Sequence, residues 1–375
     1  MQQQRRRLVW LDIAKGLSIL WIVYFHFFRT YFEHRTLTPD WHSAWSSAVR
    51  FLGMAWLQIS GLSLQAVSVF IILSGWALMQ STMRRADAGQ LSWLAWYRTR
   101  LFRLYPMYWV AHLVYLVSPF VARWEPVDHR IILSLLGLRF INIEMNFFYL
   151  NASWWFFCML IQFYLMFPLL FITARKLGPW IFLLLACAAG FYVRYLMLMV
   201  WGSNGEWIQG GFAVSRLPEF ALGMALGMWH SRSPARAEWF FLRWPGLLLG
   251  VLLYPAALQL YRNGFTYIFV DFGAGACCLG VVLGVAGLLS HLQKAAQLLA
   301  LVGTYSYGIF LIHQPYVIWL GFHVRPLPIL VFLFVAVPLT LTILSAWGMV
   351  LEKGINALMQ KLLGSKPKPA LATSG

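Results

Sequence analysis

The sequence predicts an all-α integral membrane protein with about ten transmembrane helices and both termini in the cytoplasm. Hydrophobic residues make up 61% of the 375 residues, only 11% are charged, and the mean hydropathy is +0.68. A soluble domain contains about a quarter charged residues, so this composition excludes the ordinary soluble classes. Because a membrane span needs about 20 apolar residues, the chain has room for about ten spans and little else.

Ten apolar segments follow one another along the chain, separated by charges, Gly/Pro pairs and polar clusters. The expected spans are approximately 10–31, 62–81, 103–121, 153–173, 180–200, 211–230, 245–261, 268–290, 298–320 and 327–349. An even number of spans places both termini on one side. With the N-terminus inside, cytoplasmic segments hold 18 of the 29 Lys and Arg residues and outer segments hold 8, which agrees with the positive-inside rule.

The formal net charge of +17 raises the question of nucleic-acid binding. Because the basic residues gather in the predicted cytoplasmic segments, we assign this charge to contact with membrane lipids and expect no nucleic-acid partner. No linker or repeat divides the chain. We therefore expect one transmembrane domain over 1–350, followed by a short basic cytoplasmic tail over 351–375.

The first predicted span, "LDIAKGLSILWIVYFH", carries three ionisable residues, Asp12, Lys15 and His26. Such groups within a span are costly unless they are paired or hydrated, and they often mark functional sites. Lys15 and His26 are eleven residues apart, so both project from one helix face with a separation of about 16 Å along the axis. Asp12 precedes Lys15 by one turn, and we expect the two to pair.

This spacing fits the arm of an acyl-CoA. Cations at the cytoplasmic entrance would hold the CoA phosphates, and the pantetheine arm would carry the thioester to a base deeper in the membrane. A neutral imidazole such as His26 can take a proton from an attacking hydroxyl. In the alternative interpretation, Lys15 snorkels to the interface and His26 bonds a neighbouring helix. The spacing alone favours neither.

The second and third spans add further candidates for donor binding. Ser74 and Gly75, in "VFIILSGWAL", form a small pair where another helix or a ligand can approach closely, and helix packing is the default interpretation. Arg100 and Arg103, in "YRTRLFRLYPMYW", lie one turn apart at the start of a helix that faces the cytoplasm. Planar guanidinium groups suit phosphate recognition, although positive-inside residues would show the same pattern.

Ionisable residues also occur in later spans, among them Arg194 and Asp271. Arg216 and Glu219, in "SRLPEFALGMALG", are three residues apart and can neutralise each other. They form either a paired brace beside a small-residue packing face or a contact to donor or acceptor. His313, in "GTYSYGIFLIHQP", precedes a Gln–Pro pair that perturbs the helix. A helix–helix hydrogen bond and a catalytic role explain this imidazole equally well.

Two long outer loops, about 32–61 and 122–152, are rich in tryptophan. Either an interfacial aromatic belt or a platform on which sugar rings stack would account for Trp41, Trp45, Trp56 and Trp124. The four cysteines lie within apolar segments, where a thiol behaves as a small hydrophobe. They show no metal-ligand spacing, and we expect neither a disulfide nor a metal.

Five of these segments, in this order, resemble the motifs of acyltransferase family 3, integral-membrane enzymes that move acyl groups onto extracytoplasmic glycans. The resemblance covers about residues 8–350. It rests on the basic residue and histidine of the first span, on "VFIILSGWAL", "RTRLFRLYPMYW", "RLPEFALGMALG" and "GTYSYGIFLIHQP". The resemblance implies an acyl-CoA donor, usually acetyl-CoA, that enters from the cytoplasm. It also implies that His26 is the essential histidine and that Lys15, Arg100 and Arg103 serve the donor.

The fourth span departs from the family pattern. Many members, especially those fused to a periplasmic esterase-like domain, carry W-S-L-x-x-E there. Here "SWWFFCMLIQFYLMFP" has no acidic residue after Trp155, and Gln162 is the nearest polar residue. In this respect, and in its short Lys/Pro tail, the chain is similar to the stand-alone branch, which includes enzymes similar to fucose 4-O-acetylases.

We therefore expect a multi-pass protein of a bacterial-type inner (plasma) membrane that moves an acyl group, acetyl or succinyl, from cytoplasmic acyl-CoA to a hydroxyl of an extracytoplasmic glycan. His26 would act as general base. The alternative is a carrier for a glycan or lipid-linked saccharide without acyl-transfer chemistry, in which the charges within the spans would serve the substrate path. The lack of an inverted repeat argues mildly against the carrier.

Overall fold

The computed structural model describes residues 8–32, 65–203 and 205–362, and every regular element in these ranges is helical. The longer helices are α1 (Val9–Phe32), α3 (Ala66–Asp87), α4 (Trp93–Val117), α7 (Trp155–Leu177), α8 (Pro179–Tyr195), α9 (Leu217–Arg232), α11 (Trp244–Leu258), α12 (Val270–Leu289), α13 (Gln293–Thr304), α14 (Ser306–Val324) and α16 (Val337–Leu362). The shorter ones are α5 (Arg130–Leu136), α6 (Ile143–Asn146), α10 (Pro234–Phe241) and α15 (Ile329–Val331). Short 3₁₀ or π-helical turns are η2 (Ala152–Trp154), η3 (Leu196–Val200), η4 (Trp207–Gly211), η5 (Ala213–Arg216), η6 (Gln259–Arg262), η7 (Thr266–Phe269) and η8 (Phe332–Ala336). The predicted all-α class is confirmed.

Seven helical segments are long and apolar enough to cross a membrane, and the bent pair α13–α14 makes an eighth if it counts as one span. These eight coincide with eight of the predicted spans. The spans predicted at 103–121 and 211–230 are present as α4 and α9, but neither passes the same test of length and apolarity. α9 has only 16 residues, and the first half of α4 carries three arginines. The count of ten spans stays a prediction.

The span predicted at 298–320 is not one straight helix, because α13 and α14 meet at an angle of 77°. α14 begins as a new helix, and the carboxylate of Glu352 accepts a hydrogen bond of 2.7 Å from the N–H of Gly308 in its first turn. The N–H groups of a first turn have no partner within their own helix. Glu352 belongs to α16, which continues through residue 350 to Leu362. The domain boundary predicted after residue 350 thus falls inside a helix, and 363–375 lie outside the described residues.

Glycines allow the central helices to touch backbone to backbone. A Cβ at Gly75 of α3 would clash with the carbonyl of Phe220 in α9, and a Cβ at Gly223 of α9 would clash with the carbonyl of Ile72 in α3. Gly16 makes the same kind of contact between α1 and α13. Small residues permit this close approach between membrane helices. Gly75 therefore has the packing contact that its sequence context favours.

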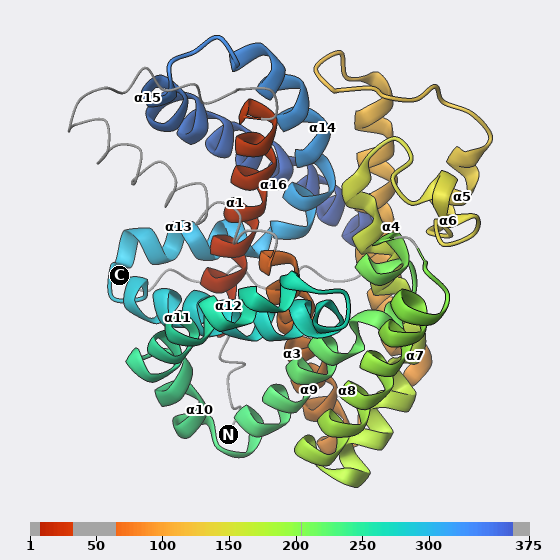
Figure 1. Cartoon of the computed structure of the whole chain (residues 1–375), viewed down its shortest axis with the longest axis vertical. Coiled ribbons are helices and arrows are strands. Elements are labelled where there is room, and N and C mark those ends of the chain that lie inside the picture. Colours follow the sequence, from red (N-terminus) through yellow and green to blue (C-terminus); the bar gives the residue numbers. More distant parts are fainter. Residues whose placement is uncertain (1–7, 33–64, 204, 363–375) are drawn as a thin grey trace.

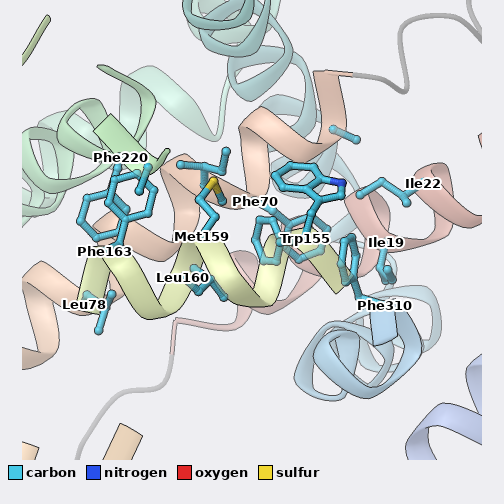
Figure 2. Close-up of a cluster of buried hydrophobic side chains, with 14 of the residues drawn as sticks. Ile19, Ile22, Phe70, Leu78, Trp155, Met159, Leu160, Phe163, Phe220 and Phe310 are labelled. Atoms are coloured by element: carbon cyan, nitrogen blue, oxygen red, sulfur yellow. The ribbon is translucent and has the colours of Figure 1, made fainter. Parts of the chain in front are cut away.

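α1 and α3 lie near the centre of the molecule, with α4–α7 on one side and α10, α11 and α13 on the other (Figure 1). α14 packs against α1, α4 and α16. The largest apolar core joins side chains from these central helices, and Figure 2 shows part of it: Ile19 and Ile22 of α1, Phe70 of α3, Phe163 of α7 and Phe310 of α14. This central region also contains the candidate site.

Candidate active site

A cavity of about 280 Å³ lies among α1, α3, α4, α7, α13 and α14. Its lining combines apolar residues with three cations and a set of hydroxyl side chains, and no Asp or Glu lines it within the described ranges. The cations are Lys15, Arg100 and Arg103, and the hydroxyl groups belong to Ser74, Ser81, Tyr164, Thr304, Ser306 and Tyr307. The fold thus brings together four of the five residues that the sequence predicted for donor binding.

Lys15 enters the cavity from α1, where its ammonium lies 3.7 Å from the carboxylate of Asp12. The pair predicted from their spacing is confirmed. Arg100 donates a hydrogen bond of 3.0 Å to Ser81 Oγ, and its guanidinium lies 5.5 Å from the ring centroid of Trp96. Across the described part of the chain, neither Arg100 nor Arg103 has an acidic partner at ion-pair distance.

The first turn of α14 also borders the cavity, although the carboxylate of Glu352 already accepts from its Gly308 N–H and counters part of its positive charge. Ser306 and Tyr307 of this turn line the cavity, and the N-terminus of a helix carries a partial positive charge with N–H groups directed outward. Tyr307 is held in place because its hydroxyl donates a hydrogen bond of 3.0 Å to the carbonyl of Leu104 in α4. Gly75, the fifth predicted donor residue, does not line this cavity and packs against α9 instead.

Two histidines lie together beyond the cavity. The ring centroids of His26 in α1 and His313 in α14 are 5.3 Å apart, and neither residue lines the cavity. His313 Nδ1 donates a hydrogen bond of 2.7 Å to the carbonyl of Phe310, which leaves the lone pair on Nε2. Nε2 is buried and has no hydrogen-bond partner among the described residues. The structure therefore pairs His26 with a second imidazole whose tautomer is fixed.

A proline in α14 explains how this helix is tied to the segment before α7. Pro315 has no N–H, so the carbonyl of Leu311, four residues earlier, has no partner within the helix. This carbonyl accepts hydrogen bonds from Asn151 Nδ2 at 2.9 Å and from Trp154 Nε1 at 2.8 Å. Asn151 and Trp154, which precede α7, thus bind α14 at Leu311, two residues before His313.

Arg216 and Glu219 form the predicted ion pair, with 2.7 Å between Arg216 Nε and a Glu219 carboxylate oxygen. The structure adds two partners that the sequence did not reveal. Asp271 of α12 lies 3.3 Å from Arg216 and 2.9 Å from Arg194 of α8. Arg216 also donates to Ser68 Oγ of α3 at 2.8 Å. Two cations and two anions thus join α3, α8, α9 and α12 in one network whose formal charges cancel.

Gln162 is the polar residue of the fourth predicted span, which has no acidic residue after Trp155. Its amide donates to the carbonyl of Gly211 and accepts from the N–H of Ala213, both at 3.0 Å. Each of these contacts goes to the irregular backbone that precedes α9. In this chain the polar residue of the fourth span therefore has a bracing contact.

The segment between α4 and α7, which the sequence predicts on the outer side, is partly folded on itself. Arg130 pairs with Asp128 at 2.8 Å and with Glu125 at 2.7 Å, and the hydrogen bonds from Arg130 lower the pKa of the Asp128 carboxyl to about 2. Trp124 is 64% exposed, and its ring centroid lies 5.8 Å from that of Phe322. The tryptophans of the first outer loop, Trp41, Trp45 and Trp56, lie outside the described residues.

The family of this chain follows from a match along almost its whole length. A family model described as an acyltransferase domain, that of acyltransferase family 3, matches residues 8–348. The chain belongs to acyltransferase family 3. The match includes every helix that lines the cavity and both members of the histidine pair. No curated protein and no solved structure matches the chain.

In this membrane protein of an acyltransferase family, the fold places a group of cations and a pair of imidazoles on the same central helices. Lys15, Arg100 and Arg103 line the cavity, and two imidazoles lie together further along α1 and α14. Sequence reasoning found all five of these residues one by one. It did not predict that His26 and His313 touch, because their contact depends on how α1 packs against α14.

Proposed function

We propose that this acyltransferase transfers an acyl group, acetyl in the first instance, from cytoplasmic acyl-CoA to a hydroxyl of an extracytoplasmic glycan. The observation that carries this proposal is the convergence of Lys15, Arg100 and Arg103 on one cavity. Two of these three cations lack an acidic partner in the described structure. Guanidinium and ammonium groups in such a setting favour phosphate oxygens, and CoA is the phosphorylated acyl carrier whose arm could span the interval to His26.

In the proposed reaction the cations hold the CoA phosphates and His26 acts as general base. The proton of the acceptor hydroxyl passes to the imidazole of His26, and the oxygen attacks the thioester carbonyl. A bond forms between that oxygen and the acyl carbon, and the carbon–sulfur bond breaks. The CoA thiolate then takes up the proton. His313 lies beside His26, and its Nε2 lone pair would accept a hydrogen bond from the reacting hydroxyl or from the protonated imidazole of His26.

The acceptor side of the proposal rests on position. His26 lies near the end of α1 that is remote from Lys15, and the excess of basic residues at the Lys15 end assigns that end to the cytoplasm. A hydroxyl would therefore meet the thioester from the opposite, outer side. We place the protein in a bacterial-type inner membrane and assign it to the stand-alone branch of the family, similar to fucose 4-O-acetylases.

Replacement of His26 tests this mechanism. Surface glycans are isolated from cells that produce the wild-type protein, His26→Ala or His323→Ala, and are compared by mass spectrometry. His323 is a matched control because it is exposed in α14 and bonds only the carbonyl of Trp319 among the described residues. We expect acyl groups on glycans from the wild type and His323→Ala, and none from His26→Ala at equal protein level. Full acylation in His26→Ala would contradict the mechanism.

A carrier without chemistry of its own is the second candidate, because the charges within the spans could also serve a substrate path. Saturable binding of acetyl-CoA to the purified protein separates the two functions. An acyltransferase requires such binding, and a carrier of glycans or lipid-linked saccharides has no need for it.

A further inference from the structure

Three phenylalanines close the cavity on the side of the histidine pair. Phe70 of α3, Phe156 of α7 and Phe310 of α14 all belong to its lining. The ring centroids of Phe156 and Phe310 are 4.9 Å apart, and each of these rings lies 6.5 Å from that of Phe70. Each of the three residues is at most 9% exposed. Their mutual contacts make an aromatic layer, by which we mean these three rings.

The aromatic layer lies between the cations and the imidazoles. Phe310 lines the cavity with one part of its surface, and its ring centroid lies 5.5 Å from that of His313. His313 in turn contacts His26. An acyl thioester held in the cavity therefore meets these rings on the side where Phe310 contacts His313.

The α1 side of the same passage is also apolar. Ile19 and Ile22 follow Lys15 by four and seven residues and precede His26 by seven and four, so all four residues share one helix face. Both isoleucines are buried in the core that contains the three phenylalanines, and Figure 2 shows them gathered near Phe310. Between Lys15 and His26 the chain thus offers no polar side chain along this stripe.

We infer that the aromatic layer selects the acyl group by size. A short acyl chain fits against the three rings, and a longer one does not. This inference rests on the proposed function. Protein interiors are packed as closely as organic crystals, and extra methylenes in a well-packed site force costly shifts. Because the three rings come from three different helices and pack against one another, room for extra methylenes requires these rings to shift. The aromatic layer accordingly makes a short acyl-CoA such as acetyl-CoA the donor, and disfavours butyryl-CoA and hexanoyl-CoA.

The test compares donors in membrane vesicles that contain the full-length protein and the cell's own glycans. Radiolabelled acetyl-, propionyl-, butyryl- and hexanoyl-CoA are supplied to the cytoplasmic face, and label in the glycan fraction is measured. We expect Phe156→Leu and Phe310→Leu to raise the ratio of butyryl to acetyl transfer about tenfold or more. A hydrophobic pocket discriminates against one extra methylene by a factor of this order. Phe156→Trp should lower transfer of propionyl relative to acetyl.

Phe163→Ala is the matched control. Phe163 is buried two turns further along α7 and stacks on Phe220 with a centroid distance of 4.2 Å, but it does not line the cavity. It should destabilise the fold without a change in the donor ratio. Because a ratio within one sample is independent of the amount of folded protein, partial loss of folding in a variant does not obscure the result.

The outcomes separate the selection of the acyl group from the proposed function. If the wild type transfers acetyl and Phe156→Leu and Phe310→Leu both keep its donor ratio, the inference about the aromatic layer is wrong and the proposed function stands. If the wild type transfers no acyl group from any of the donors, both are wrong. A change in ratio as large in Phe163→Ala as in the cavity variants would also overturn the inference, because general loosening would then explain it.

Discussion

His313 illustrates how one hydrogen bond determines what a buried side chain can do. Its Nδ1–H is used by the carbonyl of Phe310, so the ring is a neutral acceptor at Nε2, and Nε2 has no partner in the described structure. A buried polar atom without a partner is costly, and such atoms in native proteins call for an explanation. Its place beside His26 in a membrane acyltransferase supplies one, since a reacting hydroxyl or imidazole could use the lone pair.

Charged residues within the helices fall into two groups. Arg194, Arg216, Glu219 and Asp271 satisfy one another. Removal of one partner from such a buried network leaves an uncompensated charge and costs about 3–5 kcal/mol. Arg100 has no such partner among the described residues and faces the cavity. The first group therefore holds helices together, and the second remains available to a ligand.

The residue-level prediction concerns Arg100. Arg100→Ala should raise the KM for acetyl-CoA about ten- to a hundredfold with a smaller effect on kcat, because a hydrogen bond to a charged group contributes about 1.5–3 kcal/mol. Arg98→Ala is the control, since Arg98 lies on the same helix but is exposed and does not line the cavity. Steady-state kinetics of CoA release at varied acetyl-CoA measure the effect. An equal change in both variants would indicate a general effect of positive charge.

At the level of elements, α14 is held in place by hydrogen bonds to residues outside this helix. The carboxylate of Glu352 in α16 accepts a hydrogen bond from an N–H in the first turn of α14. Asn151 and Trp154 donate hydrogen bonds to the carbonyl that Pro315 leaves without a partner. A kink at proline is stable only where the freed backbone groups find new partners. These contacts fix α14 at Gly308 and Leu311, within the segment that carries Tyr307, Phe310 and His313.

The contact between α3 and α9 gives the element-level prediction. Gly223→Ala should lower the free energy of unfolding by about 1–3 kcal/mol, because its Cβ would meet the carbonyl of Ile72 and overpack the interface. Gly354→Ala is the control. Gly354 lies in α16 with no atom near the position of a Cβ, and alanine there should leave stability unchanged or raise it by up to about 1 kcal/mol.

Thermal unfolding in detergent, followed by loss of monodisperse protein, measures both glycine variants. Similar melting temperatures for Gly223→Ala and the wild type would show that α3 and α9 can separate without cost.

For the whole molecule, the central question is which membrane face the cavity serves. The cations gather at one end of the bundle, where Arg175 of α7 also pairs with Asp87 of α3 at 2.8 Å. The histidines lie further along α1, toward the segment that carries Trp124. Under the proposed function, the donor would enter at one face and the acceptor at the other, so the two substrates would meet within the protein.

Thiol labelling tests this orientation. In a variant without the four native cysteines, Ser81→Cys should react with a membrane-impermeant reagent from the cytoplasmic face alone, and CoA should slow the reaction, because Ser81 lines the cavity beside Arg100. Val127→Cys, at an exposed position between α4 and α5, should react from the outer face alone. Labelling of both positions from the same face would contradict the predicted topology.

Short-range features of this protein were determined by the sequence itself. The apolar segments specify the helices, because helical periodicity and length are local properties. The pairs Asp12–Lys15 and Arg216–Glu219 are formed as their spacing of three residues predicts. The motifs that indicate acyltransferase family 3 are likewise short and contiguous, and the family match confirms them.

Only the tertiary structure decided how these parts meet. It bends the predicted ninth span by 77°, brings Asp271 to Arg194 and Arg216, turns Gly75 toward α9 and sets an aromatic layer between the cations and the histidine pair. Each of these features depends on side chains that are distant in sequence and approach only when helices pack. Local spacing states which face a residue occupies, and the packing of one helix on another decides what that face touches.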